Sequence, residues 1–284
     1  MRTKYIVLFF VLSVLFFSCQ KEVDFSMESG GTSGGGTTGS GLLTKIVLKA
    51  GTDSTVQNFY YNIAGKFMRT SSISVAAGVT GFEDYRFVRN SQGIIDKSIS
   101  KSSDMLSSGI DSIITNVHYD AAKSRYKSWA LEYNLFGTII RDSSDFVYDA
   151  NGKIIAQVVY EDNGTGTYAI ANRLDYTYSG NNVLTAKLSS VNGSTTSEDF
   201  TINYQFDTKT SPLILGNECF LLFNNLFAFY YSGNNTVKLT TTYPSVPPET
   251  TSYNYTYNSL NKPVTQTSVM TPGSPTTLAT YYYQ

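Results

Sequence analysis

Phe146-Val-Tyr-Asp-Ala-Asn-Gly-Lys-Ile-Ile-Ala156 is the clearest copy of a pattern that recurs along this chain. A stretch with alternating aromatic residues, here Phe146 and Tyr148, leads into the small polar turn 149–152 and then into a second β-prone run. Asp, Asn and Gly tolerate the backbone conformations that tight hairpin loops require. The stretch therefore predicts one β-hairpin.

The residue just before the turn can be followed through eight copies, which are 25 to 30 residues apart. These anchor residues are Tyr61, Arg89, Tyr119, Tyr148, Tyr178, Phe206, Tyr231 and Tyr257. Two strands of about eight residues and two turns fill such a period. We therefore predict an all-β fold: a repetitive antiparallel meander of about eight hairpins, curved or rolled into a barrel-like or shell-like sheet.

Tyrosine and phenylalanine are expected to form the core. The chain has 22 Tyr and 17 Phe but one Trp. Segments such as 252–257 alternate tyrosine with small polar residues, which puts every ring on one face of a strand. Such a stripe could also serve as a ligand platform. Because every copy carries it, packing of rings across strands is the favoured interpretation.

An apolar insert near 211–228 interrupts the rhythm of the repeats. Within it, Leu213, Gly216, Cys219 and Phe220 fall roughly at helical spacing. We expect short helical turns that plug the open end of the rolled sheet. The alternative is a buried strand.

The copy around Tyr148-Asp149 resembles the YD repeat of Rhs-type proteins, in which Tyr-Asp precedes a glycine turn. The chain resembles more closely the Bacteroidetes-type surface lipoproteins of unknown function that are built on divergent repeats of this form. The resemblance covers most of residues 42–284 and implies a β-strip that coils into a shell. Tyr-Ser and Tyr-Asn replace Tyr-Asp in other copies, and the chain lacks a long array and a toxin module.

The N-terminus predicts a secretory signal peptide over residues 1–18. Arg2 and Lys4 precede an apolar run that is too short to span a bilayer comfortably. Phe16-Phe17-Ser18-Cys19 resembles a bacterial lipobox. The resemblance implies that Cys19 is acylated and becomes the mature N-terminus, which makes the membrane a partner. An ordinary signal peptide with an incidental cysteine is the alternative.

Residues 19–41 are expected to form the lipidated cysteine and a flexible tether, and residues 42–284 the β domain. Residues 29–41 contain only Gly, Ser and Thr, which cannot bury apolar surface. The segment 20–24 looks like the charged signal that directs such lipoproteins to the cell surface. The expected location is therefore the outer membrane, lipid-anchored and surface-exposed.

The composition gives no sign of a charged partner. Without residues 1–18 the chain has 19 basic and 22 acidic residues, and no basic patch argues for nucleic acid. Cys219 has no disulfide partner once Cys19 is acylated, so we expect a small buried side chain. No cofactor is implied.

A search for catalytic or metal-binding motifs is nearly empty. The single histidine, His118, is expected on a strand surface, and no cluster has metal-ligand spacing. Asp149 begins like a calcium loop but lacks the later ligands, so a turn is favoured. Carboxyl pairs for glycosidase chemistry come from the segments 83–84, 142–145 and 161–162, where solvated loop carboxylates are the favoured interpretation.

The sequence favours a non-enzymatic binding or structural role, with a glycan, a peptide or another surface protein as partner. Trp129, Tyr126 and Tyr133, with Phe136 nearby, form the one aromatic cluster that we nominate for ligand contact, although core packing is the more common use. The alternative is a secreted hydrolase that acts on polysaccharide through carboxylates brought together by the fold. A third hypothesis is a transmembrane barrel, since alternating strands also suit that class.

Overall fold

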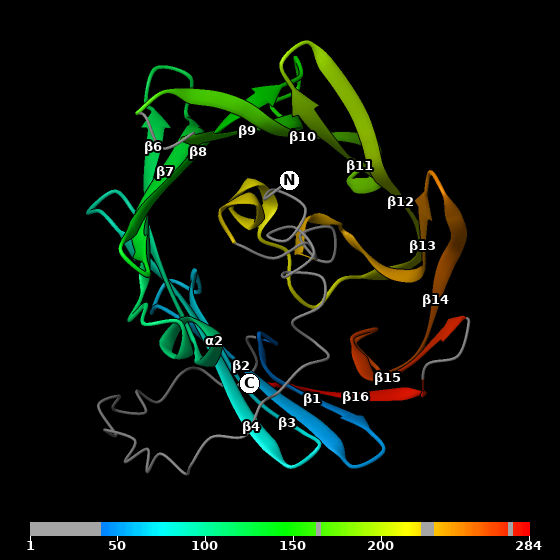
Figure 1. Ribbon diagram of the computed structural model, residues 1–284. Coiled ribbons are helices and arrows are strands. Elements are labelled where there is room, and N and C mark those ends of the chain that lie inside the picture. The colour runs from blue at the N-terminus through cyan, green and yellow to red at the C-terminus, as the bar shows by residue number, and fades with distance from the viewer. Residues whose placement is uncertain (1–40, 163–165, 223–229, 272–274) are drawn as a thin grey trace.

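The computed structural model shows one closed barrel of 16 antiparallel strands and describes residues 41–162, 166–222, 230–271 and 275–284. Every strand pairs with its neighbours in sequence, and β1 closes the sheet against β16 (Figure 1). The meander of eight hairpins is confirmed, and the rolled sheet is a complete barrel. Closure removes the unpaired edges that an open sheet of this length would expose.

The strands are β1 (Leu43–Ala50), β2 (Asp53–Tyr61), β3 (Phe67–Ala76), β4 (Val79–Arg89), β5 (Ile95–Ser102), β6 (Ile113–Asp120), β7 (Arg125–Leu135), β8 (Thr138–Tyr148), β9 (Ile154–Asp162), β10 (Tyr168–Ser179), β11 (Asn182–Asn192), β12 (Thr195–Thr210), β13 (Asn234–Tyr243), β14 (Val246–Tyr257), β15 (Pro263–Thr271) and β16 (Thr277–Tyr283). Two short helices complete the described elements, α2 (Ser103–Ser107) between β5 and β6, and the 3₁₀ helix η1 (Gly216–Leu221) between β12 and β13.

Short polar turns lie at one end of the barrel, which we call the turn rim; it comprises turns 62–66, 90–94, 120–124, 149–153, 180–181 and 258–262. The opposite end, where each odd-numbered strand is joined to the next even-numbered strand, is the mouth, and we count the pairs β1–β2 to β15–β16 as the eight hairpins. In the turn after β8, Asp149 Oδ1 accepts from the backbone N–H groups of Asn151 and Lys153, both at 2.9 Å. Gly152 there has a φ of 79°, which favours glycine. This confirms the turn interpretation of Asp149.

Anchor tyrosines join neighbouring strands at the turn rim. The hydroxyl of Tyr61 donates to the carbonyl of Leu43 at 2.8 Å, and that of Tyr148 donates to the carbonyl of Tyr126 at 2.5 Å. Each bond runs from the end of an even-numbered strand to the start of the strand before it. The repeat therefore serves a hydrogen-bonding purpose as well as a packing one.

One anchor was assigned wrongly. Tyr231 lies between η1 and β13, not at the end of a strand, because the apolar insert displaces that part of the chain from the wall. The eighth hairpin is instead β15–β16. Its anchor is Tyr283, whose hydroxyl donates to the carbonyl of Pro263 at 2.8 Å.

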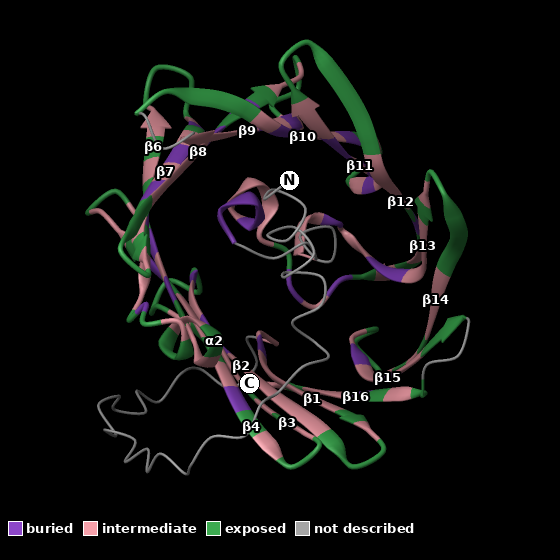
Figure 2. Ribbon diagram, viewed as in Figure 1, coloured by how far each residue is buried: buried purple, intermediate pink, exposed green. Residues whose placement is uncertain are grey.

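The aromatic face of the strands points inward. The buried cluster contains residues from nearly every part of the wall: Phe59, Phe67, Phe87, Trp129, Phe146, Tyr176 and Tyr204. The alternate positions point outward and carry ion pairs, among them Arg69 with Asp84 on β3 and β4. The hairpin ends at the mouth are largely exposed (Figure 2).

The helix η1 lies inside the barrel, as Figure 1 shows, and the second half of the helix is buried (Figure 2). Phe220 packs against Phe146 of the wall, with ring centroids 6.3 Å apart, and against Tyr176 at 5.1 Å. Cys219 is free and fully buried, as expected. The described part of the insert, 211–222, therefore confirms the predicted plug; residues 223–228 lie outside the described residues.

The two ends of the barrel chain meet at the turn rim. The N–H of Gly41 donates to the carbonyl of Gln284 at 2.7 Å, and Lys262 donates to the carbonyl of Gly41. The segment before residue 41 therefore joins the barrel at the turn rim. Among the described helices, none is long and apolar enough to cross a membrane.

Candidate functional site

Two carboxyl groups face each other across β8 and β9. Asp142 and Glu161 are register partners. Asp142 shares the inner face of β8 with Ser144 and Phe146, which alternate with it along the strand, and Phe146 contacts the plug. Directly opposed residues of antiparallel strands have Cβ atoms about 4.5–5.5 Å apart. The fold therefore brings two carboxyl groups together on the inner wall of the barrel.

The environment of this pair disfavours two negative charges. Burial, and then the nearby charge of Glu161, raise the pKa of Asp142 to about 6. Burial also raises the pKa of the Glu161 carboxyl. Two interacting carboxyl groups titrate as a pair. Near neutral pH the pair can therefore accept hydrogen bonds, and just below it the pair can also donate a proton.

Tyr133 completes this part of the wall. Burial, together with the charges of Asp142 and Glu161, raises the pKa of its phenol. It therefore stays protonated and offers an O–H donor beside two acceptors. This set of groups can hydrogen-bond hydroxyl or ammonium groups of a ligand.

Ser144 lies two residues from Asp142 on the same strand and face. Its side chain is fully buried, and its hydroxyl has no hydrogen-bond partner among the described residues. The cross-strand neighbours are Trp129 and Val159. An unsatisfied buried hydroxyl costs about 1–3 kcal/mol, and such groups are uncommon in folded proteins.

A further acid, Glu83 of β4, lies elsewhere on the inner wall, on the same face as Tyr85 and the buried Phe87. It is exposed to solvent although it points inward, which shows that solvent reaches the inner wall near the mouth. The surrounding wall still removes part of the hydration of the Glu83 carboxyl, and this desolvation, followed by the charge of Asp104, raises its pKa.

Charge is distributed unevenly along the barrel axis. The half nearer the mouth has eleven acidic residues: Asp53, Glu83, Asp104, Asp111, Glu132, Asp142, Glu161, Asp162, Glu198, Asp199 and Glu249. It has five basic residues, Lys49, Lys101, Arg141, Arg173 and Lys187. All five alternate with inward-facing residues and therefore point outward. Glu83, Asp142 and Glu161 face inward, whereas no described basic residue of this half does, so the inner wall of the mouth is acidic. Tyr85 and Tyr133 add aromatic rings to the same face.

The three nominated aromatic residues do not form one surface. Trp129 is a buried member of the core cluster. Tyr126 is buried at the turn rim, where it accepts from the N–H of Ile95 at 3.2 Å and donates to Glu218 at 3.1 Å. Only Tyr133 lies beside the carboxyl pair. Ligand contact by these residues stays a prediction, and Phe136 is exposed in the β7–β8 turn.

None of the three carboxyl pairs considered from the sequence forms a site. Asp84 binds Arg69 on the outer wall, while its neighbour Glu83 points inward. Asp162 likewise points outward and binds Arg141 at 3.3 Å. The interpretation of all three pairs as loop carboxylates was wrong, since every one of these residues lies on a strand, and 142 and 161 face inward. His118 is exposed on the outer wall, as expected.

Metal ligation finds no support in the part of the chain that the structure describes. No group of three or more His, Cys, Asp or Glu side chains is close enough to hold an ion. The pair Asp142 and Glu161 alone offers too few ligands for a protein-built calcium or zinc site.

No family model matches the chain, and no curated protein matches it. Among solved structures, it is similar to a porin-like protein from Bacteroides uniformis, with a TM-score of 0.53 and 10% identity over 85% of this chain and 98% of the other. A porin-like protein from Bacteroides vulgatus gives a TM-score of 0.51 and 9% identity over 86% and 98% of the two chains. At these identities the likeness shows the barrel fold.

Proposed function

We propose that this protein is a lipid-anchored barrel of the cell envelope that binds a neutral or positively charged ligand at its mouth. The observation that carries the proposal is the inner wall around Asp142, Glu161 and Tyr133. It combines carboxyl groups with aromatic rings, and the basic side chains of the mouth half point outward. An anionic ligand would meet uncompensated negative charge there, so it is disfavoured.

The ligand class that fits best is a glycan, with a basic peptide segment as the alternative. Carboxylates and the Tyr133 phenol hydrogen-bond sugar hydroxyl groups, and aromatic faces pack against the apolar faces of the sugar ring. An ammonium group would gain more from the charge of Glu161 and Asp142. Salt dependence distinguishes the two, because binding of a charged peptide weakens with ionic strength and glycan binding does not.

The proposed anchor is the acylated Cys19, which holds the barrel to the outer membrane through the tether 20–41. Ion pairs at mid-strand positions of the outer wall, such as Arg69–Asp84 and Arg173–Asp175, support a barrel that stands outside the bilayer. Membrane-spanning barrels instead carry an apolar band about 25 Å tall on that face. Exposure at the cell surface is part of the proposal.

The Cys19→Ala protein, prepared as residues 19–284 without the predicted signal peptide, tests ligand binding without detergent. Its single tryptophan, Trp129, lies on the inner wall and reports occupancy through fluorescence. Neutral oligosaccharides and oligolysine are the probes. We expect binding to weaken about tenfold in Asp142→Asn and Glu161→Gln, equivalent to about 1.4 kcal/mol. The matched control is Glu132→Gln, an exposed carboxylate on the outer wall; equal losses in all three variants would refute an inner-wall site.

A second candidate function is glycoside hydrolysis. It is favoured by one observation, the pKa of about 6 of Asp142 directly opposite Glu161. A protonated acid beside a carboxylate is the pair that glycosidases use. Release of reducing sugar from an oligosaccharide, abolished in both Asp142→Asn and Glu161→Gln but retained in Glu132→Gln, would establish turnover. Binding without such release supports the binding function.

A further inference from the structure

We propose that the turn rim docks on an anionic lipid surface by binding phosphate-bearing headgroups. The inference goes beyond ligand binding at the mouth, and it rests on the proposed membrane attachment for its geometry. It assigns a role to the end of the barrel opposite the carboxyl pair. Three observations support it: the bases of the turns, two cavities beside Arg125, and the place where the chain joins the barrel.

The bases belong to the repeat itself. A lysine closes the turns after β2, β8 and β14, and the β6–β7 turn and the start of β7 add three more basic residues. The six are Lys66, Lys123, Arg125, Lys127, Lys153 and Lys262. Most of their partners are neutral. Lys153 and Lys262 donate to backbone carbonyl groups, and Arg125 stacks on Tyr148 at 4.3 Å. Asp120 pairs with Lys123, and Asp149 lies near Lys153, but the other four bases have no ion pair among the described residues.

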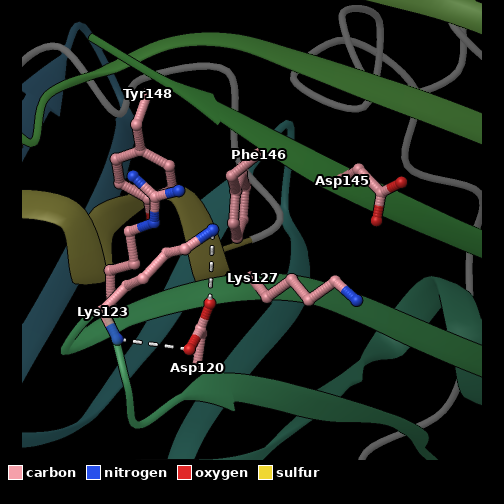
Figure 3. Close-up of a pocket in the computed structure, with 7 residues that line it drawn as sticks. Asp120, Lys123, Lys127, Asp145, Phe146 and Tyr148 are labelled. Atoms are coloured by element: carbon pink, nitrogen blue, oxygen red, sulfur yellow. Dashed lines mark hydrogen bonds and ion pairs between the residues drawn. The ribbon is translucent and has the colours of Figure 1, made fainter. Parts of the chain in front are cut away.

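Two cavities of about 240 Å³ each flank Arg125. The first is lined by Lys123, Lys127 and the ring of Tyr148 (Figure 3). Asp120 pairs with Lys123 at 3.9 Å there, whereas no ion pair of Lys127 occurs among the described residues. The second is lined by Lys66 on the other side of Arg125. Each cavity thus offers at least two cationic groups around a space that accommodates a phosphate group. Asp145 also lines the first cavity, and Glu218, which is paired with Arg89, lines the second.

The chain joins the barrel at this same rim. Gly41 is bonded to Lys262 and Gln284, so the tether begins beside the basic turns. The composition of the 22 residues from Gln20 to Gly41 predicts a coil with an end-to-end distance of about 25 Å. A lipidated Cys19 therefore keeps the rim close to the headgroups. A flexible tether does not orient the barrel, but the basic rim and the acidic mouth do so near a negative surface.

The experiment uses the Cys19→Ala protein as residues 19–284, without the predicted signal peptide, so that neither an acyl chain nor the apolar run contributes. Flotation is compared on vesicles of phosphatidylcholine alone and of phosphatidylcholine with phosphatidylglycerol. We expect flotation only with the anionic vesicles, falling several-fold in the variant Lys66→Gln, Lys123→Gln, Lys127→Gln. The matched control changes three exposed lysines nearer the mouth, Lys49→Gln, Lys101→Gln and Lys187→Gln, and should float like the parent. Circular dichroism checks that both variants fold.

Equal flotation of the two triple variants, or no flotation of the parent on anionic vesicles, would overturn the proposal. Inorganic phosphate at constant ionic strength separates the two phosphate sources. Release of the protein from the vesicles by phosphate supports binding of headgroup phosphate at the rim. Binding of inorganic phosphate by a protein that does not float on anionic vesicles would mean that the rim takes a free anion and that membrane docking is wrong. Lipidation is measured separately on the wild-type protein, so failure of the anchor and failure of the rim are distinguishable.

Discussion

Arg89 of the wall and Glu218 of the plug, 129 residues apart in the sequence, form a bidentate ion pair with both N–O distances at 2.7 Å. The guanidinium also donates to the carbonyl of Phe67 at 2.8 Å. This bond is equivalent to the one that the hydroxyl of Tyr61 makes to Leu43 in the preceding hairpin. Arg89 therefore makes the same bond to the preceding strand as an anchor tyrosine does, and it also binds the plug.

Breaking this pair from the plug side is predicted to be costly. Only 4% of the Arg89 side chain is exposed, against 26% for Glu218. Glu218→Gln leaves a buried guanidinium without a counter-charge, which costs on the order of 3 kcal/mol. Arg89→Tyr leaves the less buried carboxylate and should cost less. Urea unfolding followed by circular dichroism measures both values.

A double variant provides the decisive control for the pair. Arg89→Tyr with Glu218→Gln removes both charges and restores the repeat's own residue, so it should be more stable than Glu218→Gln alone. As a reference, Lys101→Gln breaks an ion pair between two exposed side chains, Lys101 and Asp111, which costs at most about 1 kcal/mol. Additive losses in the double variant would contradict coupling between wall and plug.

The anchor hydroxyls are predicted to stabilise the barrel individually. Tyr148→Phe removes the donor to the Tyr126 carbonyl but keeps the ring, so it should cost about 1 kcal/mol. Tyr61→Phe should behave alike. Tyr60→Phe is the matched control, since that ring lies exposed on the outer wall beside Ser71. Equal unfolding midpoints for all three variants would show that the rings, not the hydroxyls, account for the repeat.

Local signals in the sequence were sufficient to predict the hairpins. The turn at 149–152 and the alternation of rings at Phe146 and Tyr148 are both determined by residues within about a dozen positions of one another. Closure depends on pairing between β1 and β16, at opposite ends of the domain, and no local pattern reports it. The displaced anchor Tyr231 shows the same limit, because an insert moved an intact motif off the wall.

The carboxyl pair depends on a single irregularity in register. Tyr148 pairs with Ile154, but a bulge makes Val147 pair with Ala156. A register counted back from the turn without this bulge would oppose Asp142 with Tyr160 instead of Glu161. One inserted residue therefore decides which side chains meet. The sequence did contain a sign of the contact between wall and plug, because Arg89 replaces the aromatic anchor residue of the repeat at that contact.

Membrane attachment is predicted to depend on Cys19. Replacing Cys19 with Ala removes the acyl acceptor, so the protein should move from the detergent phase to the aqueous phase in a cloud-point separation. Cys219→Ala is the matched control, because that cysteine is buried and free. A Cys19→Ala protein that still enters the detergent phase would exclude the lipoprotein hypothesis.

The last prediction concerns the dependence of stability on pH. The folded-state pKa of Asp142, about 6, lies above the value near 3.9 expected in the unfolded chain. Between these values the folded protein binds more protons, so Asp142 destabilises it progressively as pH rises from 4 to 6, and fully above 6. Asp142→Asn should therefore raise the free energy of unfolding at pH 7.5, by on the order of 1–3 kcal/mol, with little change at pH 4.

Asp145→Asn, on the outer wall of the same strand, is the control, and urea unfolding at the two pH values measures both. If Asp142→Asn raises the free energy of unfolding equally at both pH values, the pKa of Asp142 is not raised in the folded protein, and the electrostatic interaction with Glu161 is excluded.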